Sequence, residues 1–206
     1  YIVCVGQKEP SESADTADRY HRGPGGDEKD GTGGFGGKAS PDFKKILRGR
    51  RSEMFEKNLV FGEQLFKNAE EAIRFGAAKL FVAGYVTEGY ADSVVERERE
   101  FPTGLPTVPY GIAIPHTDSR FVKKSGICCM RLKEPLSFRQ MGAGEETIEV
   151  YFVLLLAISD GAEHMDLLSG LMELFSNEEL LEQLERAADE EGIIEILEKT
   201  KSGLPL

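Results

Sequence analysis

The chain has 206 residues, a formal net charge of −11 and a sequence pI near 4.9. Such an excess of carboxylates argues against nucleic acid and anionic membrane surfaces as main partners. The longest apolar run, from Val150 to Ile158, is far shorter than the roughly 20 residues that span a bilayer. We therefore expect a soluble cytoplasmic protein without direct membrane insertion.

Residues 1–52 differ in composition from the rest of the chain. They are rich in glycine between Gly23 and Gly37, polar on both sides of that stretch, and almost without apolar periodicity. Such a segment buries too little surface to offset its backbone entropy, so we predict a disordered N-terminal tail. The basic cluster from Lys44 to Arg51 is interpreted as a solvated linker, with a nucleic-acid or targeting role as the alternative. Residues 53–206 are predicted to form a single folded domain.

The first part of this domain is predicted to hold one strand and two helices. Residues 59–61 are typical of a short strand. Asn68 and Glu71 have the spacing of a helix N-cap and its capping-box partner, and this helix is predicted to close at Gly84. A second helix is predicted from about Thr87 to Glu100, with one buried face formed by Tyr90, Val94 and Val95.

A loop with three prolines, residues 101–110, follows this second helix and is expected to lack regular structure and to lie near His116. Strands are predicted at 112–116, 125–132, 136–138 and 147–157, and helices at 162–175, 178–188 and 190–199. The alternating and then wholly apolar run 147–157 favours a central strand that is covered on both faces. The predicted fold class is α/β, a single domain with a mixed β-sheet flanked by helices.

Two histidines follow strong strands at short intervals. Pro115 cannot extend a sheet ladder, so the strand stops where His116 begins. His164 lies on the first predicted helical turn after the 147–157 strand, whereas His21 lies in the tail. If the two strands are parallel neighbours, His116 and His164 meet at one edge of the sheet, where neutral imidazole can act as a nucleophile.

These residues also have other interpretations. A histidine at a strand end can also be an ordinary surface residue without a catalytic role, and this alternative stays open. A metal site would need further ligands, for which Asp118 and Asp160 are candidates, but no HxH or HxxxH spacing supports them. A serine-hydrolase triad lacks the GxSxG motif, and Gly33–Lys38 lacks the spacing of a phosphate-binding loop.

The cysteines indicate neither a disulfide framework nor a zinc site. Cys4, Cys128 and Cys129 are odd in number and lack CxxC spacing. In a strand, the adjacent pair would point to opposite faces of the sheet. We therefore expect ordinary free cysteines and no bound metal or cofactor.

Residues 54–206 resemble the enzyme IIA component of the bacterial phosphotransferase system, in its fructose/mannitol/nitrogen-regulatory superfamily. The features that carry the resemblance are Arg97-Glu98, Thr103-Gly104, the GIAIPH motif at 111–116, residues 157–165 and the helix 167–174. The length of the bridge from Leu105 to Tyr110 looks most like the galactitol-type branch.

The resemblance implies that His116 accepts a phosphoryl group from the phosphocarrier protein HPr and passes it to a cysteine of enzyme IIB, serving a membrane enzyme IIC indirectly. It also implies that His164 is the second active-site histidine and that Arg97 is the family's arginine before Glu98. Arg97 would contact the phosphoryl oxygens at the active site, or else anchor the loop or an acidic partner. Thr103 and Thr117 are further candidates that would donate hydrogen bonds to the phosphoryl group. Phosphoryl transfer of this kind needs positioning and charge stabilisation more than a cofactor.

Two other functions stay open at this point. A regulatory module whose phosphorylation state controls a partner protein would use the same histidine. A metal-dependent hydrolase would contain stoichiometric zinc. The sugar is not predicted by this domain.

Overall fold

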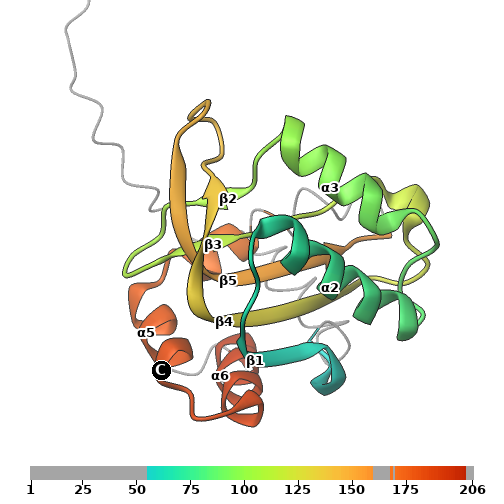
Figure 1. Cartoon of the computed structure of the whole chain (residues 1–206). Helices are drawn as coiled ribbons and strands as arrows, with labels where there is room; N and C mark the ends of the chain where they lie inside the picture. The colour runs from blue at the N-terminus through green and yellow to red at the C-terminus, as the bar shows by residue number, and fades with distance from the viewer. Residues whose placement is uncertain (1–54, 160–167, 169, 203–206) are drawn as a thin grey trace, which may run out of the picture. The chain divides into compact units, whose positions relative to one another are not determined.

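A five-stranded mixed sheet with helices on both faces forms the fold in the computed structural model (Figure 1). The structure describes residues 55–159, 168 and 170–202, all within the compact unit Phe35–Leu206. The elements in chain order are η2 (Lys57–Leu59), β1 (Val60–Gln64), α2 (Ala69–Val82), α3 (Tyr90–Glu100), β2 (Gly104–Leu105), β3 (Gly111–Ala113), η3 (Ser119–Phe121), β4 (Gly126–Arg139), β5 (Thr147–Ala157), α5 (Glu178–Arg186) and α6 (Glu190–Ser202). The predicted tail, residues 1–52, lies outside the described residues.

The strands lie in the order β1-β4-β5-β3-β2. β1 pairs with β4 and β3 with β5 in parallel, whereas β4 pairs with β5 and β2 with β3 in antiparallel fashion. The predicted α/β class with a mixed sheet is therefore confirmed. The strand that leads to His116 and the strand 147–157 are parallel neighbours, with Gly111 opposite Val150 and Ala113 opposite Val153.

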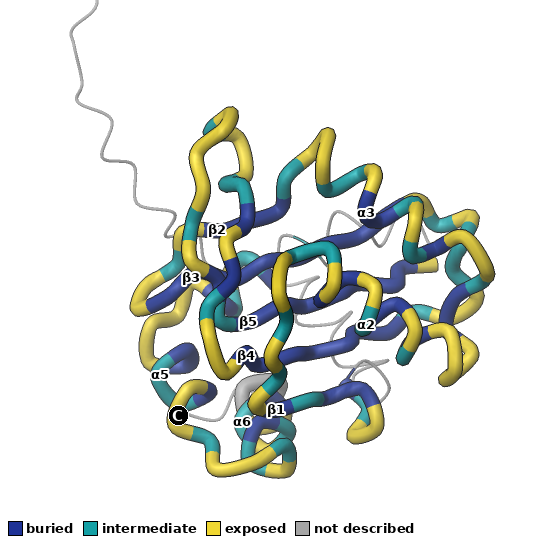
Figure 2. The backbone as a smooth tube through the Cα atoms, viewed as in Figure 1, coloured by how far each residue is buried: buried dark blue, intermediate teal, exposed yellow. Residues whose placement is uncertain are grey.

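β5 is the central strand, and it divides the apolar core into two layers. Phe152, Leu154 and Leu156 pack with α5 and α6, whereas Val153 and Leu155 pack with α2 and α3. All five side chains are at most 1% exposed, and Figure 2 shows the same continuous burial along the strand. The alternation in the sequence thus predicted correctly that both faces are covered.

The adjacent cysteines of β4 take opposite faces of the same sheet. Cys128 belongs to the core layer under α2 and α3, and Cys129 to the layer under α5 and α6. Both are free and buried, and burial raises the pKa of the Cys129 thiol to about 12. Their expected role as ordinary core residues agrees with this placement.

The first helix begins as its sequence predicted, and the second begins later. Asn68 Oδ1 accepts a hydrogen bond from Glu71 N at 2.9 Å, and Gly84 follows α2 with a φ of 81°. α3 begins at Tyr90 rather than near Thr87. The amide and hydroxyl of Thr87 both donate to Phe121 O, at 2.8 and 3.2 Å, which ties the preceding segment to η3 instead.

Two expectations about strands were wrong. Residues 125–132 and 136–138 belong to one strand, β4, with an irregularity between Arg131 and Leu136 where Pro135 has no amide to donate. The proline-rich loop contains a short strand, β2, because its Gly104–Leu105 stretch contains no proline and pairs with β3.

The proline-rich loop lies near His116 only at its beginning. Thr103 O accepts a hydrogen bond from Ile114 N at 3.4 Å. The turn from Leu105 to Tyr110 lies at the opposite end of β3, where the Tyr110 hydroxyl donates to Leu181 O (Figure 1). The expectation that the whole loop lies near His116 was therefore wrong, since the hairpin directs its turn away.

Gly111 permits β3 to approach β5 closely, and we expect its replacement by alanine to destabilise the fold. A Cβ at this position would lie 2.6 Å from Glu149 O, a backbone atom that cannot move aside without breaking the pairing. We expect Gly111→Ala to lower the free energy of unfolding by about 1–3 kcal/mol, measured by urea denaturation.

Gly192→Ala is the matched control for this substitution. Its Cβ would meet nothing closer than 3.5 Å, in α6, where alanine is the better helix former. The control should therefore unfold at the same urea concentration as the parent or at a higher one. Equal unfolding midpoints for the parent and Gly111→Ala would contradict the expectation.

Within the described residues, no helix is both long enough and apolar enough to cross a bilayer.

Candidate functional site

His116 lies at the end of the GIAIPH segment, held against the central strand. Leu156 N donates to Pro115 O at 3.0 Å, and His116 forms a parallel bridge with Leu156. The imidazole is only 5% exposed, and its Nδ1 lies 2.8 Å from Ile114 O. Because a carbonyl oxygen only accepts, Nδ1 carries the proton in this hydrogen bond. In the neutral tautomer with this proton, the lone pair of the ring lies on Nε2.

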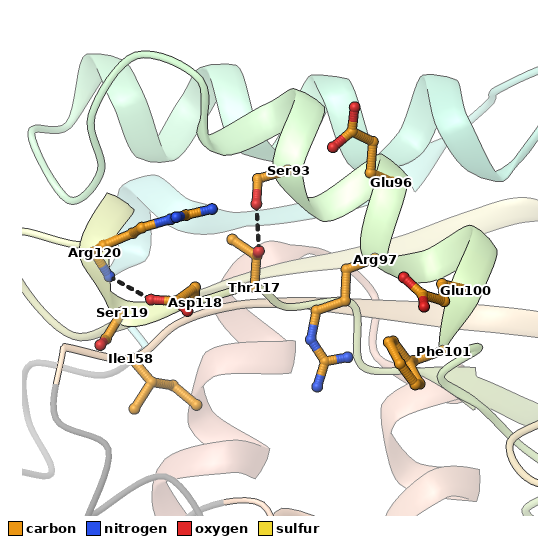
Figure 3. A pocket seen from close by; sticks show the side chains of 10 residues that line it. All are labelled: Ser93, Glu96, Arg97, Glu100, Phe101, Thr117, Asp118, Ser119, Arg120 and Ile158. Atoms are coloured by element: carbon orange, nitrogen blue, oxygen red, sulfur yellow. Dashed lines mark hydrogen bonds between the residues drawn. The ribbon is translucent and has the colours of Figure 1, made fainter.

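A pocket of about 560 Å³ lies between α3 and the segment that follows His116 (Figure 3). α3 and the residue after it contribute Ser93, Arg97 and Phe101 to its walls. The other side is formed by Thr117, Arg120 and Ile158. The lining thus combines the two guanidinium groups and several hydroxyl groups with three carboxylates, those of Glu96, Glu100 and Asp118. Guanidinium and hydroxyl groups can bind anionic oxygens, so we expect any such contact on the side of Arg97 and Thr117 rather than beside these carboxylates.

Arg97 points into this pocket from α3 (Figure 3). Its guanidinium carbon lies 5.5 Å from the ring centroid of Phe101, a cation–π contact that limits the side chain's freedom. Arg99 takes a different direction on the same helix, since it pairs with Glu70 at 2.6 Å. Of these two arginines of α3, the predicted residue is thus the one that lines the pocket.

Thr117 follows His116 directly and is 6% exposed. Its Oγ1 lies 2.6 Å from Ser93 Oγ, and this hydrogen bond connects the His116 segment with α3 (Figure 3). A second connection is the Tyr90 hydroxyl, which donates to Leu156 O at 2.8 Å. Burial raises the pKa of Tyr90, so this hydroxyl stays protonated and continues to donate. The helix that carries Arg97 is thereby held against β5 and against the segment that follows His116.

Thr103 lies beside the strand, but both of its donors are directed at Glu98. Its amide donates to Glu98 Oε1 at 2.9 Å, and its hydroxyl donates to Glu98 Oε2 at 2.7 Å. Burial raises the pKa of Glu98, while the two hydrogen bonds from Thr103 act in the opposite direction. In the sequence, Glu98 stands out only as the neighbour of Arg97. The local signal that was missed is a carboxylate five residues before a threonine, across a helix end.

His164 and Asp160 lie outside the described residues. Of the predicted site residues, Arg97 and Thr117 thus line the same pocket, and Thr117 directly follows His116. Thr103 does not line this pocket; it lies beside the β3 segment, where its carbonyl oxygen accepts from Ile114 N. Among the residues it describes, no group of three His, Cys, Asp or Glu side chains is arranged to hold a metal ion.

The chain belongs to the family of phosphotransferase-system enzyme IIA domains of the second type. The family model for the phosphoenolpyruvate-dependent sugar phosphotransferase system, EIIA 2, matches residues 53–200, which include the whole described fold up to α6. This is the family that the GIAIPH motif and its surroundings had indicated.

The chain is also similar to several curated proteins. The mannitol-specific phosphotransferase enzyme IIA component of Enterococcus faecalis is 35% identical over 139 residues, which cover 65% of this chain and 90% of the relative. The transcriptional regulator ManR of Bacillus subtilis is 33% identical over 126 residues, 61% of this chain and 18% of the regulator. Multiphosphoryl transfer protein 1 of Escherichia coli is 33% identical over 141 residues, 68% of this chain but only 16% of that longer protein.

A solved structure supports the same fold. The enzyme IIA of mannitol from Escherichia coli, in complex with phosphorylated enzyme IIB of mannitol, is 24% identical, with a TM-score of 0.59. The match covers 70% of this chain and 99% of that one. At this identity the likeness concerns the fold.

Proposed function

We propose that this chain is a cytoplasmic phosphoryl carrier that accepts a phosphoryl group from phospho-HPr on His116 and passes it to a cysteine of an enzyme IIB. The observation that carries the proposal is the hydrogen bond from Nδ1 to Ile114 O, which orients the ring and leaves the lone pair on Nε2. A membrane enzyme IIC would then use the phosphoryl group during sugar uptake. No cofactor or metal takes part in these steps.

Each transfer step exchanges one bond for another. In the first step, the Nε2 lone pair of His116 attacks phosphorus in line, and the bond between phosphorus and the donor nitrogen of HPr breaks. The imidazole then carries phosphate on Nε2 and a proton on Nδ1, which Ile114 O continues to accept. In the second step, a thiolate of enzyme IIB attacks phosphorus, and the bond to Nε2 breaks to return neutral imidazole.

The pocket residues would stabilise the transferred group. Arg97 has a planar guanidinium that can contact two phosphoryl oxygens at once. Thr117 would donate a further hydrogen bond. His164, which lies outside the described residues, is assigned the same role from the family resemblance alone. Thr103 is assigned an indirect role, because its amide and hydroxyl already donate to Glu98.

We further propose that the transported substrate is a sugar alcohol. The relative from Enterococcus faecalis is mannitol-specific by name. Galactitol is another hexitol, and its assignment depends only on the length of the bridge from Leu105 to Tyr110. The bridge ends at Tyr110, whose hydroxyl donates to Leu181 O in α5. Its length therefore affects the end of the β2–β3 hairpin that lies away from His116.

A regulatory module is the second candidate function. The likeness to the transcriptional regulator ManR favours it, since a domain of this type occurs within a regulator. The same phosphorylation of His116 would then change the affinity for a partner protein instead of supplying enzyme IIB.

The experiment that separates the two candidates follows labelled phosphate from phosphoenolpyruvate. The full chain is incubated with enzyme I and HPr, and purified hexitol enzyme IIB proteins are then added. We expect acid-labile, base-stable label on the chain, followed by its transfer to enzyme IIB. Label that stays on the chain would favour regulation, and a chain that never accepts label would contradict both candidates.

A further inference from the structure

The carboxylate of Glu98 forms a two-bond clamp across the end of α3. It accepts the Thr103 amide at 2.9 Å and the Thr103 hydroxyl at 2.7 Å, one on each oxygen. Thr103 is 2% exposed and Glu98 is half-buried, so the threonine side of the pair is shielded from water while the carboxylate is only partly so. A carboxylate is the side chain that satisfies both donors, because a glutamine would present one accepting oxygen and one donating nitrogen.

The clamp continues into the hydrogen bonds that hold His116. Thr103 O accepts from Ile114 N at 3.4 Å, and Ile114 O accepts from His116 Nδ1 at 2.8 Å. Glu98, Thr103, Ile114 and His116 thus form a contiguous series. One end of the series holds the imidazole, and the other end lies on α3 next to Arg97.

The residue that contacts the Arg97 guanidinium lies in the chain between the two residues of the clamp. Phe101 lies between the two clamp residues, its amide donates to Arg97 O at 2.6 Å, and its ring lies under the Arg97 guanidinium. Phe101 is 56% exposed, so burial of the ring does not hold it in place. The fixed ends at Glu98 and Thr103 are what restrict this short segment.

We propose that Glu98 is a positioning residue. By binding Thr103, it holds Arg97 in a fixed position relative to His116. This inference rests on the proposed phosphoryl-carrier function and adds a residue to it. Because reacting groups tolerate little misplacement, loosening the clamp slows transfer without removing any group that touches phosphate.

The test compares the phosphoryl-transfer rates of the same substitutions made in the parent chain and in the Arg97→Ala variant. Rapid-quench measurements with phospho-HPr are made on Thr103→Val, Glu98→Gln and the matched control Thr103→Ser, which keeps both donors. We expect about tenfold slower transfer for Thr103→Val and Glu98→Gln, with unchanged final labelling, and a rate within about twofold of the parent for Thr103→Ser. In an Arg97→Ala background, the same changes should lower the rate by less than about twofold further, because coupled residues are not additive.

Several outcomes would overturn the inference. Equal fold losses in both backgrounds would mean that Glu98 acts independently of Arg97. A lower melting temperature with an unchanged rate would mean that the clamp only stabilises the fold. If Glu98→Gln does not fold, by circular dichroism, Thr103→Val alone decides the result. Failure of the parent to accept label would instead contradict the proposed function, so the two failures are distinguishable.

Discussion

His116→Ala is expected to accept no phosphate from phospho-HPr above background, whereas the parent becomes labelled. Alanine removes the nucleophilic nitrogen, and the transfer has no other acceptor at this position. The measurement is incorporation of labelled phosphate from phosphoenolpyruvate in the presence of enzyme I and HPr. Because His116 is buried and its ring donates to Ile114 O, circular dichroism must show that the variant is folded.

His21→Ala is the matched control for this experiment, since it removes another of the three histidines of the chain. It should become labelled as fast as the parent. Equal labelling of His116→Ala and the parent would contradict the assignment of the phosphorylated residue. Phosphorus–nitrogen coupling in the labelled parent provides a further check, because phosphate on Nδ1 rather than Nε2 would contradict the role that the Ile114 hydrogen bond indicates.

Arg97→Ala is expected to slow phosphoryl transfer by about 10²-fold, the size of effect typical for removing one preorganised donor from a site of developing charge. Arg97→Lys should give an intermediate rate, because lysine keeps the charge but loses the planar pair of donors. Stability should change little, since the contact that fixes the guanidinium is with the exposed ring of Phe101. Single-turnover rates with phospho-HPr measure the effect.

Arg99→Ala is the control for Arg97→Ala. It removes an arginine from the same helix, but one that pairs with Glu70 instead of lining the pocket. The control should transfer phosphate at the parental rate. If the two variants are slowed equally, loss of positive charge from α3 explains the effect and the specific role of Arg97 is wrong.

Local signals in the sequence were sufficient for most helices and for the central strand. Asn68 and Asn177 accept the amides of Glu71 and Leu180, as N-cap residues do. β5 has the bounds that its alternation predicted, Thr147–Ala157. These features depend on residues a few positions apart, so the sequence contains the whole interaction.

Pairings between distant residues were not predictable in the same way. β2 is only two residues long, and no propensity signals a strand that forms because β3 is present beside it. The join across Pro135 in β4 likewise depends on β5, which pairs with β4 on both sides of the proline. Without that neighbour, a proline between two apolar runs indicates two separate strands.

The sequence by itself predicted a strand that ends before His116, and the GIAIPH motif was sufficient to indicate the family. The predicted bounds, 112–116, were too long, because β3 ends at Ala113 and His116 is joined to β5 only by an isolated bridge to Leu156. Only the tertiary structure decided which ring nitrogen of His116 holds the proton, because that depends on Nδ1 reaching Ile114 O. It also decided that Arg97 lines the pocket and that Thr103 donates to Glu98. The physical reason is that side-chain direction depends on how α3 packs against the sheet, which residue spacing along the chain does not specify.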